Sequence, residues 1–152
     1  MRKLFLTFFY LGLSKKAPGT VGSFGALIVG LLIMQYLNEQ TLFLLSLLLL
    51  IVGAKETNIY QQQNGVHDPK EIVIDEVAGM FLALSLSGAT LIQAILSFIF
   101  FRIYDIWKPS IIGKIDKNVK SGWGVMGDDM LAGVFAGISS ALLYFLYIKF
   151  LG

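Results

Sequence analysis

The chain has 152 residues, of which 56% are hydrophobic and only 14% charged, and its formal net charge is +2. A mean hydropathy of +0.74 is far above that of a soluble domain, in which about 25% of residues are charged. The small net charge, without a long basic run, excludes a broad nucleic-acid-binding surface, so we expect no nucleic acid among the partners. The absence of cysteine excludes disulfides and cysteine nucleophiles, and a single histidine excludes sites that need two. We therefore predict an all-α, polytopic integral membrane protein with a single domain over 1–152.

The N-terminal apolar segment, Leu4–Leu13, follows Met1-Arg-Lys and has the composition of a short signal sequence. It is followed by Lys15 and Lys16 without a small-residue cleavage site, so we expect it to be retained as an interfacial helix. Four uncharged stretches come after it and can be compared with the roughly 20 apolar residues that span a bilayer. They are 21–38, 40–54, 77–101 and 130–148.

The third stretch, 77–101, decides the topology. As one span it would place the lysine-rich segment Arg102–Asp129 on the opposite side of the membrane from the basic N-terminus, against the positive-inside tendency. A break at Ser85–Thr90 resolves this conflict and gives a short helical hairpin, so we predict four to five apolar helices. The polar segments Ser14–Ser23, Asn64–Glu76 and Arg102–Asp129 would then all face the cytoplasm.

The acidic residues are clustered. Six of the ten lie in three groups, namely Asp75 with Glu76, Asp105 with Asp116, and Asp128 with Asp129. The stretches "DEVAG" and "DMLAG" share the form Asp-x-x-Ala-Gly, with an acid at the start of an apolar helix. The acid suits the positive end of the helix dipole, and the Ala-Gly pair lets another helix approach closely. Capping and packing alone would explain either stretch by itself.

The stretch "FRIYDIWKP", residues 101–109, places Arg102 and Asp105 on one helix face, with a helix end near Pro109. If the hairpin forms, three acidic groups and two cations converge on one surface patch. Oxygen ligands without cysteine indicate a hard ion, Mg²⁺ or Mn²⁺ before Zn²⁺. Because Mg²⁺ in proteins commonly shares its ligands with phosphate oxygens, the pattern predicts phosphate chemistry at a membrane surface.

The stretch "GLSKKAPGTVGS", residues 12–23, supplies glycines, hydroxyls, two lysines and the start of a helix whose free amides favour anions. It is not a Walker A loop, because Gly-Lys-Ser/Thr does not follow at the required spacing. We interpret it as a phosphate cradle, although a Gly/Ser/Lys entry to a membrane helix is common without any such function.

With "GLSKKAPGTVGS", "IDEVAG", "FRIYDIWKP" and "GWGVMGDDMLAG" in this order, the chain resembles the phosphatidylglycerophosphatase A family. The resemblance implies a phosphoric monoester hydrolase that converts phosphatidylglycerophosphate, an anionic phospholipid, to phosphatidylglycerol and phosphate with Mg²⁺. It also implies a multi-pass protein of the bacterial cytoplasmic (inner) membrane, and the hairpin topology predicted above then places the active site on the cytoplasmic side. The sequence "VHD" at 66–68 resembles the family pattern too. The family's motif positions fall on Asp75, Glu76, Arg102, Asp105, Trp107, Lys108, Pro109, Asp128 and Asp129.

The individual roles are our inference. We expect one or two Mg²⁺ to polarise the terminal phosphate and activate a water, with an aspartyl-phosphate intermediate as the alternative. The candidate metal ligands are Asp75, Glu76, Asp105, Asp128 and Asp129. The candidate catalytic residues are Asp129, Glu76, Asp105, Lys108 and Arg102. The candidate phosphate-binding residues are Lys15, Lys16, Thr20, Ser23, Arg102 and Lys108. We favour structural roles for Asp116 and His67.

Other functions remain open at this point. A CDP-alcohol phosphatidyltransferase would also be small and Mg²⁺-dependent, but its Asp-Gly-x₂-Ala-Arg signature is absent. A cation transporter or channel would use acids near helix ends, although nearer the middle of the membrane. A non-catalytic assembly subunit would not need such a set of acids and bases.

Overall fold

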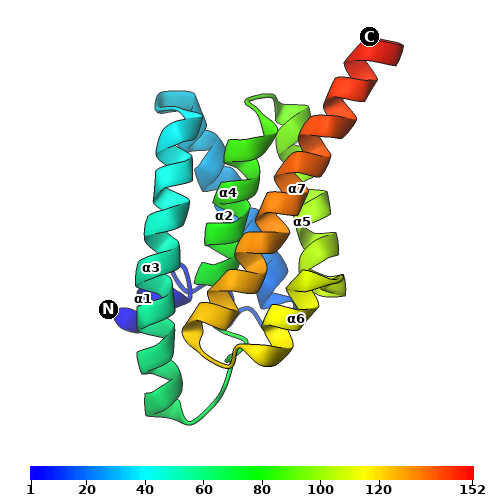
Figure 1. Ribbon diagram of the computed structural model, residues 1–152. Coiled ribbons are helices and arrows are strands. Elements are labelled where there is room, and N and C mark those ends of the chain that lie inside the picture. The colour runs from blue at the N-terminus through cyan, green and yellow to red at the C-terminus, as the bar shows by residue number, and fades with distance from the viewer.

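The computed structural model describes residues 1–152 and consists of helices and connecting loops, without strands. Three helices, α2, α3 and α7, are long and apolar enough to cross a membrane. The predicted helical membrane bundle is thereby confirmed (Figure 1). In chain order the elements are α1 (Arg2–Leu6), η1 (Leu11–Leu13), α2 (Pro18–Tyr36), α3 (Glu39–Asn64), α4 (Ile74–Ser87), α5 (Leu91–Trp107), α6 (Ile111–Asn118) and α7 (Gly122–Leu151).

The stretch 77–101 is a hairpin of two helices, as predicted. Helix α4 ends at Ser87, Gly88 follows with a φ of 110°, and Thr90 caps α5 in a reciprocal capping box with Gln93. The Gln93 amide also donates to the Ser87 carbonyl, so the turn satisfies its own backbone groups. This internal bonding leaves fewer backbone groups of the turn in need of partners at the membrane surface.

Helix α4 forms the centre of the bundle. It packs against α2, α3, α5 and α7, and nearly all of its residues are buried. Figure 1 shows it between the long helices, with α7 crossing it and extending beyond the bundle at the C-terminus. A short central helix surrounded by longer ones explains why α4 is apolar on every side although it is only 14 residues long.

Helices α4 and α7 cross at their glycines. A Cβ on Gly133 would collide with the Gly79 carbonyl oxygen, and a Cβ on Gly137 would lie 2.8 Å from the Ala83 carbonyl oxygen. The two backbones therefore touch along this line, which we call the glycine seam. The close approach expected from the two Ala-Gly pairs is confirmed.

The N-terminal segment differs from the single interfacial helix expected over 4–13. Helix α1 ends at Leu6, and Phe8, Phe9 and Tyr10 have positive φ values of 46°, 56° and 68°. The chain turns because Leu6 is fully buried and its carbonyl accepts a hydrogen bond from the Val73 N–H. Tertiary packing beside the start of α4 thus outweighs the local preference for a continuous helix.

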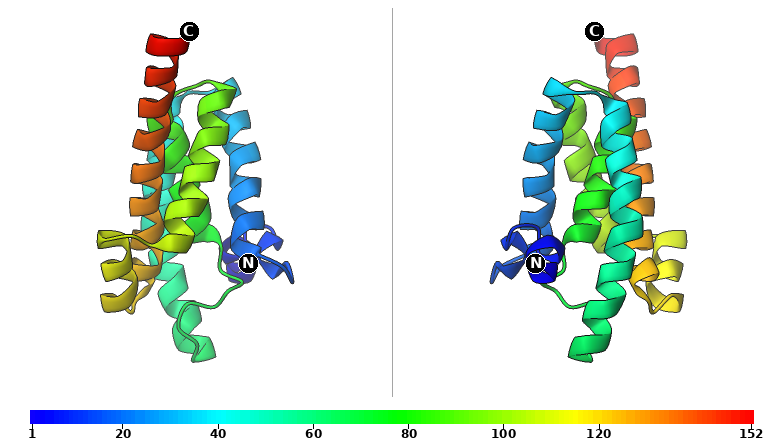
Figure 2. Two further views of the ribbon diagram at one scale, coloured as in Figure 1. Left: turned by 90° about the vertical axis from the view of Figure 1, so that its right-hand side faces the viewer. Right: turned by 90° about the vertical axis from the view of Figure 1, so that its left-hand side faces the viewer.

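The polar segments gather at one end of the bundle. The starts of α2, α4 and α7, the end of α5, and all of α6 lie at this end, whereas the turns after α2 and α4 and the C-terminus lie at the other (Figures 1 and 2). The three segments that the sequence places on one surface, Ser14–Ser23, Asn64–Glu76 and Arg102–Asp129, are accordingly together.

Candidate metal and phosphate site

Three carboxylates meet between the first turn of α4 and the second turn of α7. Single oxygen atoms of Asp75, Glu76 and Asp129 all lie within 4.8 Å of one another. Asp75 and Asp129 are 7% and 3% exposed. The glycine seam sets this arrangement, because it brings the Asp129 carbonyl oxygen to 2.5 Å from where a Cβ on Gly79 would be.

The start of α7 is fixed by a neighbouring helix. The side-chain oxygen of Asn58, on α3, accepts a hydrogen bond from the Gly122 N–H at 2.6 Å. A Cβ on Gly122 would lie 3.0 Å from the Asn58 backbone nitrogen and would also strike the Ala54 carbonyl. Helix α3 therefore holds the first turn of α7, one turn before Asp128 and Asp129.

The carboxylates carry buried oxygens that no protein donor satisfies. These atoms are Oδ1 of Asp75, Oε2 of Glu76 and Oδ2 of Asp129. Buried charges are ordinarily paired or coordinate metals, because an unpaired one is strongly disfavoured. Three neighbouring carboxylates, each with a buried oxygen that lacks a protein partner, are the hard donors that Mg²⁺ prefers, so the residues present fit this ion.

Arg102 lies on the α2 side of the carboxylates. It pairs with Asp105 one turn along α5, and its Nη1 donates to the Ser23 hydroxyl at 3.3 Å. The Ser23 hydroxyl in turn donates to the Gly19 carbonyl at 2.7 Å. This chain of bonds ties the guanidinium to the first turn of α2.

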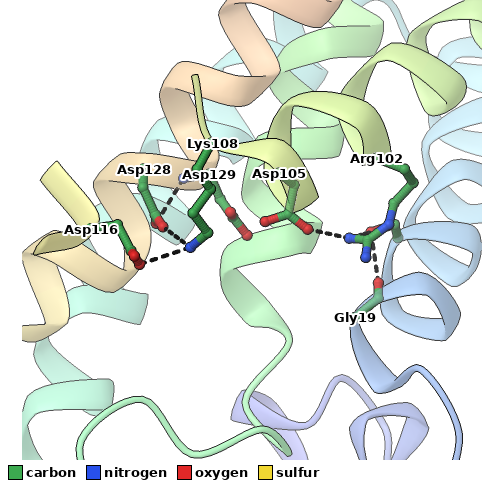
Figure 3. A network of polar contacts seen from close by, with 8 residues as sticks. Gly19, Arg102, Asp105, Lys108, Asp116, Asp128 and Asp129 are labelled. Carbon is green, nitrogen blue, oxygen red and sulfur yellow. Dashed lines mark hydrogen bonds and ion pairs between the residues drawn. The ribbon is translucent and has the colours of Figure 1, made fainter. Parts of the chain in front are cut away.

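Lys108 lies on the opposite, α6 side (Figure 3). Its ammonium group donates to Asp116 at 2.8 Å and to Asp128 at 2.7 Å. Partial burial works against its charge, but these two hydrogen bonds prevail and raise the pKa of Lys108 above its ordinary value. Burial also works against the charge of Asp116, which by itself would raise its pKa. The hydrogen bond from Lys108 outweighs this effect and holds the pKa of Asp116 below its ordinary value.

These groups surround a pocket of about 360 Å³. Its wall consists of the first turn of α2, the loop 68–72, the starts of α4 and α7, and the end of α5. Three non-glycine residues of the wall have left-handed backbone, with φ values of 47° at Ala17, 50° at Asp68 and 48° at Lys108. Such strained positions persist where the surrounding structure holds them, and they are concentrated at functional sites.

The structure brings most of the candidate residues together. The wall includes Thr20 and all five carboxylates proposed as metal ligands, together with Arg102 and Lys108. Ser23 is fully buried behind Arg102, so its hydroxyl bonds to the protein. Lys15 and Lys16 are exposed and are not part of the wall.

Three further polar residues, Asp68, His67 and Asp116, lie in or near the pocket. Asp68 is part of the pocket wall although sequence reasoning gave it no role; the "VHD" stretch was the signal for it. His67, next to it, is exposed, and its Nδ1 lies 3.5 Å from Gln61 rather than in the pocket. Asp116 lies outside the wall and accepts a hydrogen bond from Lys108.

Comparison with known proteins identifies the family of the chain. The sequence profile of the phosphatidylglycerophosphatase A family matches residues 4–144. The chain belongs to the phosphatidylglycerophosphatase A family. It is therefore an enzyme of the phosphoric monoester hydrolase class, and the predicted family and enzyme class are confirmed.

Individual relatives cover most of the chain. It is 39% identical to phosphatidylglycerophosphatase A of Escherichia coli over 136 residues, which are 89% of this chain and 77% of that protein. It is 35% identical to the Haemophilus influenzae protein of the same name, over 84% of this chain and 78% of that protein. It is also 34% identical to a putative phosphatidylinositol-3-phosphatase of Bacteroides thetaiotaomicron, over 90% of this chain and 89% of that protein. No solved structure gives a significant match.

Proposed function

We propose that this protein is a Mg²⁺-dependent lipid phosphatase that hydrolyses phosphatidylglycerophosphate to phosphatidylglycerol and phosphate. The observation that carries the proposal is the set of buried, unpartnered oxygens of Asp75, Glu76 and Asp129, at one end of a membrane bundle. The family gives the reaction class, and these oxygens give the reason for the metal. A transporter is less well supported, because the acids lie in a pocket at the end of the bundle.

The residues divide into two groups by their contacts. Asp75, Glu76 and Asp129 would hold Mg²⁺, which when bound supplies positive charge to phosphate oxygens and activates water. Asp105 and Asp128 are already engaged by Arg102 and Lys108, so their main role would be to position these cations.

The cations would stabilise charge on the substrate. Arg102 and Lys108 lie on opposite sides of Asp105 and Asp129 (Figure 3), where they can neutralise phosphate oxygens. Glu76 would be either the third metal ligand or, through its unpartnered Oε2, the base that takes the proton of the attacking water. The water oxygen bonds to phosphorus, the bond from phosphorus to the headgroup oxygen breaks, and a proton returns to that oxygen.

We further propose that the pocket faces the cytoplasm from the inner membrane of a bacterium. The end that carries the pocket is rich in exposed lysines, whereas Lys149 lies in the last turn of α7 at the other end. The exposed lysines at the pocket end include Lys15, Lys16, Lys70, Lys114, Lys117 and Lys120.

A phosphoinositide is the second candidate substrate, since one relative is named as a putative phosphatidylinositol-3-phosphatase. Both lipids carry a phosphomonoester on a polyol headgroup, two carbon–carbon bonds from the carbon that carries the phosphodiester. The carboxylates and cations of the pocket suit a phosphomonoester at this distance from a phosphodiester, on either glycerol or inositol.

The test is release of inorganic phosphate by purified protein from three lipids in mixed micelles: phosphatidylglycerophosphate, phosphatidylinositol 3-phosphate and phosphatidic acid. We expect Mg²⁺-dependent release from the first lipid. Faster release from phosphatidylinositol 3-phosphate would identify a phosphoinositide as the substrate instead. Preference for phosphatidic acid, which has no phosphodiester, would contradict both. A folded wild type that releases no phosphate from any of them, with or without Mg²⁺, would contradict the proposed activity.

A further inference from the structure

The rim of the pocket between α2 and α5 carries an exposed apolar side chain, unlike the rest of the wall. Among the large apolar side chains of the wall, Ile72 and Val125 are buried, at 3% and 6% exposure. Ile106, at the end of α5, is 71% exposed. An apolar side chain that lines a charged pocket and also faces outward marks a side of the pocket suited to hydrocarbon.

The other rims are charged. On the α6 side, Lys108 bonds to Asp116 and Asp128. On the side of the loop 68–72, the exposed residues Asp68 and Lys70 form the wall. Hydrocarbon is disfavoured at both of these sides, because charged groups would have to be desolvated.

An exposed apolar surface continues from Ile106 away from the pocket. Helix α5 carries a row of exposed isoleucines at helical spacing, which we call the isoleucine row: Ile92, Ile95, Ile99, Ile103 and Ile106. Next to it on α2, Phe24 is 53% exposed and contacts Phe98 of α5 edge-on, with ring centroids 6.1 Å apart. Figure 2 (left) shows α2 and α5 as neighbours on this face of the bundle.

Arg102 stands where the pocket meets this surface. It is three residues after Ile99 and four before Ile106, so the three side chains are neighbours on α5. Its side chain is only 15% exposed, and its Nε is buried without a partner although Nη1 is bonded. A buried, free guanidinium N–H beside an apolar rim is complementary to a phosphodiester whose acyl chains remain in the membrane.

We propose that the phospholipid substrate enters the pocket sideways from the membrane, through the rim between α2 and α5. The acyl chains lie against the isoleucine row and Phe24, the phosphodiester lies at Arg102, and the terminal phosphate reaches the carboxylates of Asp75, Glu76 and Asp129. This inference rests on the proposed function. It explains how a lipid can react without leaving the bilayer.

Two single-cysteine variants test the route, because the natural chain has no cysteine. Ile106→Cys places a thiol on the proposed entry rim. Ile111→Cys is the matched control, since Ile111 is 51% exposed at the same end of the molecule but on α6. Each variant is assayed on long-chain phosphatidylglycerophosphate before and after modification with a bulky anionic methanethiosulfonate. The rate of modification is also measured with and without that lipid in the presence of a chelator.

We expect modification of Ile106→Cys to lower kcat/KM by about tenfold or more, mainly through KM, and the lipid to slow the modification itself. Ile111→Cys should change by no more than about twofold in either measurement. Equal effects on both variants, an effect on Ile111→Cys alone, or no effect on either would overturn the proposed route. Activity of the unmodified wild type tests the proposed function separately, and protection by lipid under chelation reports on the route even if phosphate is not released.

Discussion

At the scale of single residues, Asp129 combines deep burial with an unpartnered carboxylate oxygen beside two other acids. Without a cation this arrangement costs stability, since buried like charges repel and lack donors. Sites of this kind commonly trade stability for activity. The pairing of Lys108 with Asp116 and Asp128 shows the contrasting case, in which acids are satisfied by the protein itself.

Asp129→Asn should therefore be more stable than the wild type when metal is absent. We expect a gain of about 1–3 kcal/mol, or roughly 3–10 °C in Tm. Adding Mg²⁺ should raise the Tm of the wild type, because an ion that binds the folded state stabilises it, and should have little effect on the variant. Thermal unfolding in detergent with chelator and with Mg²⁺ measures both effects. A variant that is less stable without metal and gains as much from Mg²⁺ as the wild type would remove Asp129 from the metal site.

Asp116→Asn tests the ion pair with Lys108 through its pH dependence. The folded-state pKa of Asp116 is lowered, so the pair stabilises the protein above about pH 4 and this contribution is lost as the pH falls through the lowered value. The folded-state pKa of Lys108 is raised, so the contribution persists up to about pH 10. Because the Asp116 side chain is 39% exposed, solvent screening limits the contribution of this ion pair to the free energy of unfolding to about 0.5–1 kcal/mol.

The Tm of the wild type should accordingly exceed that of Asp116→Asn by a constant margin between about pH 5 and pH 9. The margin should shrink as the pH falls below about 4. Asp116→Glu keeps the charge and serves as the control. A margin that grows on acidification would show that the pairing seen in the structure is not what stabilises this region.

At the scale of elements, the glycine seam positions the site. Gly133→Ala would push a methyl group into the Gly79 carbonyl, so we expect a loss of about 1–3 kcal/mol together with reduced activity as Asp129 moves away from Asp75. Gly127→Ala on the same helix is the control, because its Cβ would meet only Ile115 at 3.6 Å. There the usual gain of about 0.5–1 kcal/mol from replacing a helical glycine should apply. Equal stability of the two variants, measured by thermal unfolding, would mean that α4 and α7 do not touch along this line.

Much of the arrangement of elements follows from the sequence. The hairpin at 77–101 is predictable because charge asymmetry and the Gly88 region both favour a break there. The glycine seam follows from the repeated Ala-Gly pair. The turn after α1 could not be predicted, because it depends on the burial of Leu6 and on its backbone hydrogen bond with Val73, far along the chain.

Within the site, too, what depends on tertiary packing could not be predicted from the sequence. The three acidic groups are visible in the sequence, but whether a given acid faces a metal or a cation depends on the packing of helices. Ser23 illustrates this, because its hydroxyl turns to Gly19 and Arg102 although it stands in a stretch typical of phosphate binding. Asp68 illustrates the converse, since a loop acid becomes part of the pocket wall only through tertiary structure.

At the scale of the whole molecule, the pocket and the turn Gly88–Thr90 lie at opposite ends of the bundle. Ala89→Cys and Lys120→Cys, both at exposed positions, should be labelled from opposite sides of the membrane. A membrane-impermeant maleimide applied to intact cells should label the first, and should label the second only after permeabilisation. Labelling of both from one side would contradict the topology, and reversed labelling would place the pocket outside the cell.

The central claim is that a metal held by Asp75, Glu76 and Asp129 drives hydrolysis of a lipid phosphomonoester. The most direct measurement is phosphate release from phosphatidylglycerophosphate as a function of Mg²⁺ concentration, for the wild type and for Asp129→Asn. We predict saturable dependence on Mg²⁺ in the wild type, no release with chelator, and a loss of about 100-fold or more in the folded variant. Full activity of the wild type under chelation, or of Asp129→Asn with Mg²⁺, would contradict the claim.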